Sequence, residues 1–190
     1  MRDRAVRRLQ ECAAVASQFG ALLVVGQMQG FLSDEPDQSK GEARIESCLK
    51  QVVETTQQYG TRIAFEPVNH LQSGFHNTLE AVMALARRID SPRFKPMLDT
   101  FHMNIEEVSL TEPIHRAGRD LVHFHLCESN GSFLGSGHLN LAAAFAALDK
   151  IEYRGFASVK VYRHAWKLGA ESSIRYLHNL LEGQGGDREI

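Results

Sequence analysis

Apolar residues follow two different spacings along the chain, one typical of buried strands and the other typical of amphipathic helices. Short apolar and β-branched runs with polar residues on either side predict five strands. The expected strands are residues 21–25, 62–66, 95–99, 121–125 and 156–160. Between these runs, apolar residues recur every three or four positions and predict one-sided helices. Strands and helices therefore alternate along most of the chain.

Sequence signals mark the starts of several expected helices. The helices cover residues 2–19, 42–59 and 78–89, and further ones begin at Thr111, near Asn140 and at Glu171. Asn77 and Glu80 have the spacing of a capping box, and Asn140 can cap the helix that follows it. Residues 183–190 offer no apolar face to bury, so we expect a flexible tail there.

The alternation of strands and helices predicts an α/β fold with a parallel sheet, either an open sheet or a (β/α)8 barrel. A complete barrel has eight strands and takes about 250 residues, whereas this chain has 190 residues. We therefore expect a partial (β/α)8 TIM barrel of about five βα units over residues 1–182, truncated at its amino-terminal side. An incomplete barrel leaves a sheet edge to cover, which predicts a homo-oligomer.

Composition and charge exclude several classes of protein. The chain is 43% hydrophobic and 23% charged, with a formal net charge of -2, so it lacks the basic character of proteins that bind nucleic acids or anionic membranes. Its charged start has no apolar stretch of signal-peptide length, and no apolar run could cross a membrane. Cys12, Cys48 and Cys127 do not have the spacing of a zinc or redox site. These features predict a cytoplasmic protein that acts on a small molecule.

Polar residues end four neighbouring expected strands. They are Glu66, Asp99, His125 and Lys160. In parallel α/β folds, ligands and catalytic groups gather at the carboxyl ends of the strands. A glutamate, an aspartate and a histidine form a suitable ligand set for a divalent metal ion. Any one of them could instead be an ordinary strand-end residue that caps a helix, but three in register favour a metal site.

The residues around these positions closely resemble the ketose 3-epimerases of the xylose isomerase-like sugar isomerase and epimerase barrels. The most specific stretch is LDTFHMNIEE at residues 98–107, and three shorter matches accompany it. These are EPVN at 66–69, HFHLCESN at 123–130 and GSGH at 135–138. The resemblance extends from the first helix to about Tyr162 and implies that the five strands are the last five of eight.

The resemblance implies roles for individual residues. Glu66 would be both a metal ligand and a proton-transfer base, Asp99 and His125 would be metal ligands, and His102 would bind a substrate oxygen. Epimerisation beside a ketone needs bases that flank the reacting carbon and a cation that polarises the carbonyl group. The two carboxylates favour Mn²⁺ or Mg²⁺ as that cation, and Co²⁺ or Zn²⁺ are also compatible with the ligand set.

Several positions depart from the pattern of this family. Lys160 stands where the resemblance implies a glutamate that is the second base and fourth ligand. Its ammonium would repel a divalent ion, and it ligates only after losing a proton from a pKa that is normally about 10.4. Gly131 and His70 replace arginines, and Gln72 replaces a glutamate. The polar contacts to the sugar are therefore changed, with Asn69 and Gln72 as the substrate-binding candidates that follow the second expected strand.

Two interpretations of Lys160 remain open at this point. In the first, a neighbouring cation lowers the pKa of Lys160, which acts as a second base or as an electrophile for an enediolate. In the second, metal binding is weak or absent, and the protein is a catalytically impaired carbohydrate-binding or interaction protein. The leading hypothesis is a sugar isomerase or epimerase that acts on a ketose or keto-polyol by metal-assisted proton transfer. A phosphodiester-cleaving nuclease ranks lower, because its chemistry uses a richer set of metal ligands.

Other polar and aromatic residues allow a functional and a structural interpretation. His138 either caps the helix after it or faces the pocket. The polar loop 33–41 is either a lid over the site or a solvated connector. Trp166 and His164 either close over a sugar or pack against the rim of the barrel. His76 is expected to be an ordinary surface or helix residue.

Overall fold

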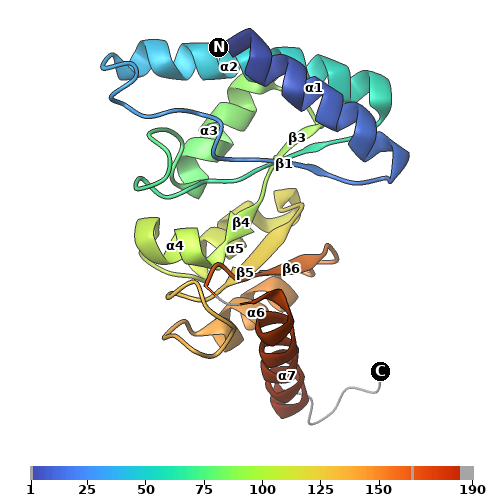
Figure 1. The fold of residues 1–190 in the computed structure, drawn as a ribbon, viewed down its shortest axis with the longest axis vertical. Helices are drawn as coiled ribbons and strands as arrows, with labels where there is room; N and C mark the ends of the chain where they lie inside the picture. Colours follow the sequence, from blue (N-terminus) through green and yellow to red (C-terminus); the bar gives the residue numbers. More distant parts are fainter. Residues whose placement is uncertain (1, 164, 185–190) are drawn as a thin grey trace. The chain divides into compact units, whose positions relative to one another are not determined.

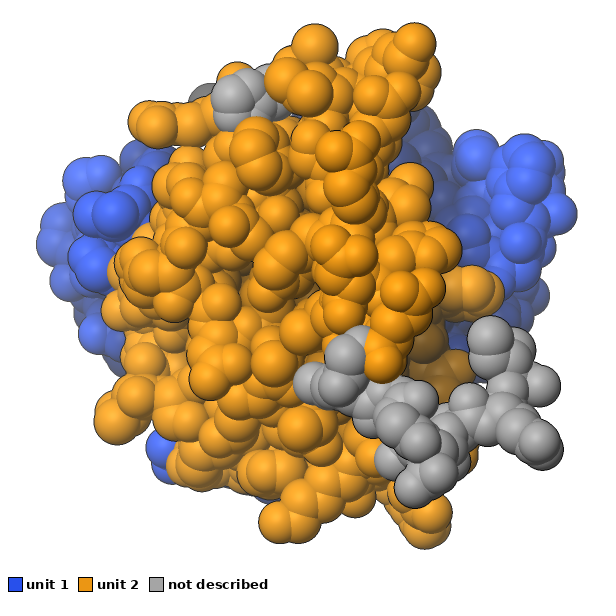
Figure 2. Space-filling view, turned by 90° about the horizontal axis from the view of Figure 1, so that it is seen from below, with its two compact units in different colours: residues 1–98, 120–123 blue, residues 99–119, 124–190 orange. Residues whose placement is uncertain are grey.

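The computed structural model describes residues 2–163 and 165–184, and the chain divides into two compact units. The first unit comprises residues 1–98 and 120–123, and the second comprises residues 99–119 and 124–190. Figure 1 shows the order of the elements, and Figure 2 shows the two units in different colours. Each unit has a three-stranded sheet.

The first unit has a parallel sheet in the order β1-β2-β3, with a helix before each strand. Its elements are α1 (Arg2–Gln18), β1 (Leu23–Val25), α2 (Gln38–Tyr59), β2 (Ile63–Phe65), α3 (Leu79–Ile89) and β3 (Phe94–Pro96). In the register of this sheet, Leu23 pairs with Ile63, and Ile63 pairs with Phe94. The alternation of strand and helix predicted for this part of the chain is confirmed.

The core of the first unit forms between the sheet and the apolar faces of its helices. Helix α1 packs along α2 (Figure 1). The buried core residues are Val6, Leu9, Val25, Leu49, Val52, Val53, Ile63, Phe65, Val82, Leu85, Ile89 and Phe94. Burial of each large apolar side chain contributes about 1.5–3 kcal/mol relative to exposure. The spacing of these residues along each helix is the spacing from which the helices were predicted.

Side-chain caps set the starts of two helices, and both differ from expectation. Asp37 accepts a hydrogen bond from the Lys40 amide, so α2 begins at Gln38. Residues 38–41 of the loop expected at 33–41 are therefore helical. Thr78 caps α3, whereas the expected cap, Asn77, donates its amide to two carbonyl groups of the preceding loop. Both caps use side-chain oxygens of preferred types. The choice between two adjacent acceptors depends on contacts outside the helix.

His76 is buried in the first unit, so the expectation of an ordinary surface or helix residue is wrong. It is 7% exposed and has a positive φ of 50°. Its Nδ1 lies 2.7 Å from Oε1 of Gln29, an acceptor, so Nδ1 carries a proton; in the neutral ring Nε2 then carries none. Nε2 is buried with no hydrogen-bond partner among the described residues, and the ring packs edge-on against Phe65. The neutral imidazole is therefore the form that this position accommodates.

We expect the free energy of unfolding to fall as the pH drops below 6.5. Burial lowers the pKa of His76 from 6.5, Arg88 adds to this shift, and Glu42 and Glu46 on α2 oppose it. The unfolded chain thus binds this proton more readily than the folded chain, and stability is lost as the pH falls through this range. Urea unfolding at pH 7.5 and 5.5 should show a smaller pH effect for His76→Gln than for the native protein. An equal effect in the two proteins would contradict this account.

The second unit has a sheet in the order β4-β5-β6, with helices between successive strands and after the last strand. Its elements, with β4 and η1 at the unit boundary, are β4 (Leu98–Asp99), α4 (Thr100–Glu106), α5 (Glu112–Ala117), η1 (Gly118–Asp120), β5 (Phe124–Cys127), α6 (Leu141–Lys150), β6 (Ala157–Lys160) and α7 (Trp166–Gln184). Strands β5 and β6 are parallel. Asn140 caps α6 as expected, accepting a hydrogen bond from the Ala143 amide at 3.0 Å.

Several expected boundaries in the second half of the chain are wrong. The strand expected at 95–99 is divided into β3, which belongs to the sheet of β1 and β2, and β4, which belongs to the sheet of β5 and β6. Strand β5 begins three residues later than expected, so His125 lies within the strand instead of at its end. Helix α7 begins at Trp166 instead of Glu171, and α4 was not expected. The predicted tail at 183–190 lies mostly outside the described residues.

All three cysteines are free, and Cys127 is buried while Cys12 and Cys48 are partly buried. Within residues 2–163 and 165–184, no helix combines the length and the hydropathy that crossing a membrane requires.

Exposed apolar side chains surround β1 in the first unit. Phe19, Val24, Met28 and Phe31 are exposed, and β1 is at the edge of its sheet. Open strand edges and apolar patches favour association. We expect a homo-oligomer, so light scattering should give a multiple of the 21.3 kDa chain mass. A stable monomer at low micromolar concentration would contradict this expectation.

Candidate active site

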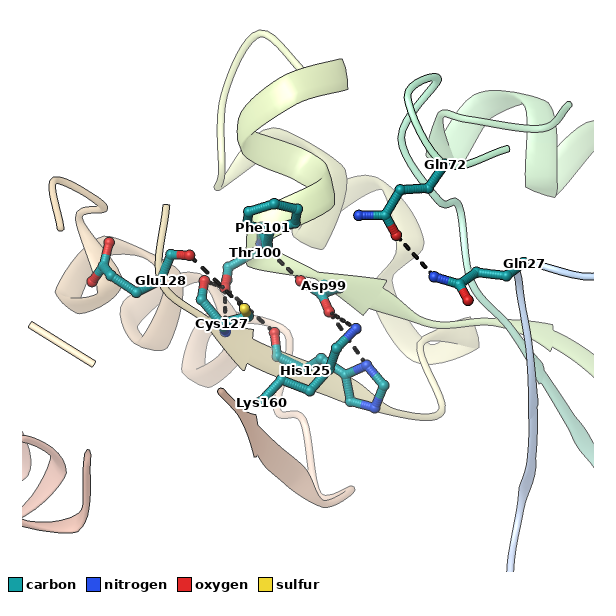
Figure 3. A network of polar contacts seen from close by, with 9 residues as sticks. All are labelled: Gln27, Gln72, Asp99, Thr100, Phe101, His125, Cys127, Glu128 and Lys160. Carbon is teal, nitrogen blue, oxygen red and sulfur yellow. Dashed lines mark hydrogen bonds and ion pairs between the residues drawn. The ribbon is translucent and has the colours of Figure 1, made fainter. Parts of the chain in front are cut away.

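Three of the polar residues predicted from strand ends meet in the second unit around one carboxylate oxygen. Asp99 is completely buried, and its Oδ2 lies 2.6 Å from Nζ of Lys160 and 3.4 Å from Nδ1 of His125 (Figure 3). The other oxygen of Asp99 accepts a hydrogen bond from the Phe101 amide at 2.8 Å. Both carboxylate oxygens therefore have partners within this unit.

The register of the sheet explains why these side chains meet. In the β5–β6 pair, His125 is opposite Ser158 and Cys127 is opposite Lys160. Side chains alternate along a strand, so residues two positions apart lie on one face of the sheet. His125 and Lys160 consequently share a face. Asp99 reaches the same place as the N-cap of α4, directly after β4.

Thr100 fixes the start of α4 against β5, a role that the sequence analysis did not identify. Its Oγ1 accepts a hydrogen bond from the Cys127 amide at 2.8 Å and donates one to the Cys127 carbonyl at 2.7 Å. Thr100 is completely buried. Its only sequence signal is a small hydroxyl residue directly after the aspartate. This double contact holds Asp99 in place next to His125.

The electrostatics of the cluster keep Asp99 ionised. Burial alone would raise the pKa of Asp99, but the hydrogen bond with His125 and the positive charges of Lys160 and His102 outweigh it. The pKa of Asp99 is lowered from 3.8 to about 2. The contact with Lys160 is therefore an ion pair between a carboxylate and an ammonium. This favours the cationic, electrophilic interpretation of Lys160 over its interpretation as a base.

Aromatic rings border the cluster. Nζ of Lys160 lies 5.4 Å from the centroid of the Tyr162 ring, and Tyr162 packs against Phe101 at 5.6 Å between ring centroids. Phe101 in turn contacts His102 at 5.5 Å between centroids, and His102 is buried on α4. Burial raises the pKa of the Tyr162 phenol, so that ring stays neutral. Tyr162 was not predicted to be a site residue, although its position two residues after Lys160 could have indicated that it lies near the cluster.

The backbone of Gly131 is in direct contact with Tyr162. The Gly131 carbonyl accepts hydrogen bonds from the Tyr162 and Arg163 amides at 2.8 and 3.2 Å. Gly131 has a φ of 69°, and a Cβ at this position would lie 3.2 Å from Cδ2 of Tyr162. An arginine here would have to adopt a left-handed conformation and displace the ring. Two departures from the family pattern, Gly131 and Lys160, are thus linked through Tyr162.

Glu128 organises the loop that follows β5, and the sequence analysis did not assign it a role. It is 1% exposed, and its carboxylate accepts hydrogen bonds from the amides of Ser129, Leu139 and Gly135 at 2.9, 3.1 and 3.2 Å. His138 contacts Ser129 through both its backbone amide and Nδ1. The side chain of Asn140 caps α6, so the interpretation of His138 as the cap of that helix is wrong.

We expect Glu128→Gln to lower the free energy of unfolding by about 2 kcal/mol, because hydrogen bonds to a buried charge are worth about 1.5–3 kcal/mol. Urea unfolding measures this change. The matched control is Glu112→Gln, which removes the carboxylate of an exposed ion pair with Arg116 on α5. That pair should contribute less than about 1 kcal/mol. Equal losses in the two variants would show that the loop does not depend on Glu128.

In the first unit, Glu66 follows the carboxyl end of β2. It is 6% exposed, and its amide donates to the Val25 carbonyl at 2.8 Å. A Cβ on Gly26 would lie 3.0 Å from Oε2 of Glu66 and 2.7 Å from Cγ2 of Val68. A glycine is therefore needed for the backbone after β1 to pass so close to Glu66. The convergence of Glu66 with the ligands of the second unit stays a prediction.

The two substrate-binding candidates of the first unit lie in the loop after Glu66. Asn69 is completely buried, its Oδ1 accepts a hydrogen bond from the Leu71 amide at 3.1 Å, and its carbonyl accepts one from the Gln72 amide. Oε1 of Gln72 accepts a hydrogen bond from Nε2 of Gln27 at 2.8 Å (Figure 3). Asn69 therefore shapes the loop that positions Gln72, and their contacts to a sugar stay predictions.

Two residues after β6, Trp166 and His164, were candidates for contact with a sugar. Trp166 is the first residue of α7 and is 82% exposed. His164 lies outside the described residues. Both interpretations of these residues, closure over a sugar and packing against the rim of the barrel, are untested.

Comparisons with known proteins identify the family of the chain. A model of the xylose isomerase-like TIM barrel family matches residues 1–180. A probable ketose 3-epimerase from Synechocystis is 29% identical over 163 residues, which are 84% of this chain and 54% of that protein. An L-ribulose 3-epimerase from Mesorhizobium japonicum is 32% identical over 153 residues, 79% of this chain and 51% of that protein. The chain spans about half the length of these curated relatives.

Solved structures share the fold over most of the chain. An L-ribulose 3-epimerase structure matches with a TM-score of 0.81 at 26% identity and covers 95% of this chain and 68% of its own. A 3-keto-D-glucoside 4-epimerase from Escherichia coli matches with a TM-score of 0.83 at 22% identity and covers 93% of this chain and 70% of its own. The resemblance to ketose 3-epimerases is confirmed by these relatives. The chain belongs to the xylose isomerase-like TIM barrel family.

Proposed function

We propose that this chain carries the catalytic residues of a sugar isomerase or epimerase that acts on a ketose or keto-polyol through an enediolate. The observation that carries the proposal is the cluster of Asp99, His102, His125 and Lys160 in the second unit. Asp99 and His102 lie in the motif that most resembles ketose 3-epimerases. The curated relatives support it, since they are named as epimerases of ketoses. The strands would correspond to the last five of an eight-stranded barrel.

The proposed chemistry begins with proton removal from the carbon beside the substrate ketone. Glu66 accepts this proton, the C–H electron pair forms the enediolate double bond, and the carbonyl oxygen takes the negative charge. A solvent water that protonates the same carbon from the opposite face gives the epimer, whereas return of the proton from protonated Glu66 to the neighbouring carbon gives the aldose isomer. A cation near the carbonyl oxygen stabilises the intermediate. His102, Asn69 and Gln72 would contact the other oxygens of the sugar.

A divalent ion is the cation that the family resemblance implies. The chain carries three side chains of the kinds that hold such an ion, Glu66, Asp99 and His125. They suit Mn²⁺ or Mg²⁺, and Co²⁺ or Zn²⁺ are also compatible. Lys160 does not suit the ion, because its ammonium lies 2.6 Å from Oδ2 of Asp99. The residues together therefore do not fit a tightly held divalent ion, and no step of the proposed chemistry depends on one.

A second candidate function is a catalytically impaired carbohydrate-binding protein. The same Lys160–Asp99 ion pair favours it, since the pair neutralises the carboxylate at the centre of the cluster. This candidate retains sugar contacts but removes no proton from carbon. The two functions therefore differ in whether substrate hydrogen exchanges with solvent.

The experiment that tests the proposal is incubation with a panel of ketohexoses and ketopentoses in D₂O. We expect deuterium to enter the carbon beside the ketone, followed by formation of an epimer or aldose, detected by NMR and chromatography. Exchange detects proton removal even where little product accumulates. Sugar binding without exchange across the panel would favour the impaired protein. The absence of both sugar binding and exchange would contradict both candidate functions.

A further inference from the structure

The Asp99 carboxylate has a partner on each oxygen. Oδ1 accepts from the Phe101 amide at 2.8 Å, and Oδ2 contacts the Lys160 ammonium at 2.6 Å and faces Nδ1 of His125 at 3.4 Å. A divalent ion bound by Asp99 and His125 would need the oxygen that Lys160 now contacts. Such an ion therefore has to displace the ammonium before it can bind.

The Lys160 side chain is held in this position from two sides. Its ammonium has the buried Asp99 carboxylate on one side and the Tyr162 ring on another, with 5.4 Å from Nζ to the ring centroid. The Lys160 side chain is 25% exposed, and Phe101 and Gly131 pack against Tyr162. Aromatic faces attract cations, so the ring adds to the attraction of the carboxylate. Movement of the ammonium out of the cluster would lose both interactions.

We propose that the Lys160 ammonium is the resident cation of this cluster, taking the place of a divalent ion at Asp99 and stabilising the negative charge on the substrate oxygen. This inference rests on the proposed function. An ammonium has three N–H groups, so it can contact Asp99 and a substrate oxygen at the same time. As the proton leaves the carbon, the charge that forms on the carbonyl oxygen is balanced by Lys160. The ammonium keeps its own protons throughout this step.

Calorimetric titration with Mn²⁺ tests where the cation sits, without any assay of activity. We expect the native protein to bind Mn²⁺ no tighter than millimolar, Lys160→Gln to bind at least about 10-fold tighter, and Lys160→Glu at least about 100-fold tighter. Asp99→Asn in the Lys160→Glu background should abolish the gain. Lys95→Gln is the matched control, because it removes a lysine from another 2.6 Å ion pair, with Asp120. Micromolar binding by the native protein, or no change in Lys160→Gln, would overturn the proposal.

Turnover by EDTA-treated protein is the second measurement. We expect the native protein to keep its rate of deuterium exchange after metal removal, Lys160→Gln to lose at least about 100-fold, and Lys160→Arg to keep part of the rate because it keeps the charge. Circular dichroism shows that each variant is folded. Loss of native exchange on metal removal would overturn the proposal. No exchange by the native protein with or without metal would instead contradict the proposed function, while the Mn²⁺ titration would still locate the cation.

Discussion

Replacing Glu66 by glutamine should lower the rate of deuterium exchange into the substrate by about 10²–10⁴-fold, the usual contribution of a positioned general base. Glutamine has nearly the same shape, so the close approach of Gly26 to this side chain is preserved. The amide cannot accept a proton from carbon. Sugar binding, measured by calorimetry, should change far less than the exchange rate.

The matched control for Glu66→Gln is Glu54→Gln. Glu54 is an exposed carboxylate on α2 in the same unit, and its replacement should leave the exchange rate unchanged. Circular dichroism should show native secondary structure in both variants. If Glu66→Gln exchanged substrate hydrogen at the native rate, a different group would have to be the base.

Local patterns were sufficient to predict the helices of the first unit. Leu9, Leu49 and Val82 are buried because apolar residues at helical spacing lie on one face, and this spacing is a property of neighbouring residues. The exact helix starts were not predictable in the same way. Thr78 caps α3 because Asn77 is engaged with loop carbonyls, and the sequence does not show that competition.

The meeting of Asp99 with His125 was predictable from the order of parallel strands, although the boundaries of β5 were wrong by several residues. The error left the prediction intact because strand neighbours remain neighbours when a boundary moves. Lys160 was recognised as a departure from the family pattern, but its ion pair with Asp99 depends on where a long flexible side chain settles. Periodicity carries no information about that choice.

Residues that depend on distant contacts gave no sequence signal. His76 is buried because Gln29, far from it in the chain, supplies a hydrogen-bond acceptor. In the sequence, Glu128 was noted only as part of the HFHLCESN stretch at residues 123–130. In the structure it accepts hydrogen bonds from three amides of the loop after β5. Both are buried polar side chains for which the fold supplies at least one hydrogen-bond partner.

Replacing Asp99 by asparagine should lower the free energy of unfolding at pH 7 by about 2 kcal/mol, because the charge that pairs with Lys160 is lost while the side-chain oxygen that caps α4 is kept. The pKa of Asp99 is about 2 in the folded protein and 3.8 as its ordinary value. The unfolded chain therefore binds this proton more readily, and the contribution of Asp99 is present above about pH 4 and lost as the pH falls toward 2. Urea unfolding across this range should show a smaller loss of stability in Asp99→Asn than in the native protein.

The control for the Asp99 prediction is Asp120→Asn. Asp120 pairs with Lys95 at the same 2.6 Å distance, but its side chain is 53% exposed, whereas that of Asp99 is completely buried. Water and salt screen the exposed pair, so its loss should cost less than about 1 kcal/mol and should respond to added salt. If the two variants lost the same stability with the same pH profile, burial would not strengthen the Lys160–Asp99 pair. A larger loss of unfolding free energy in Asp99→Asn than in Asp120→Asn would show that the buried ion pair stabilises the second unit.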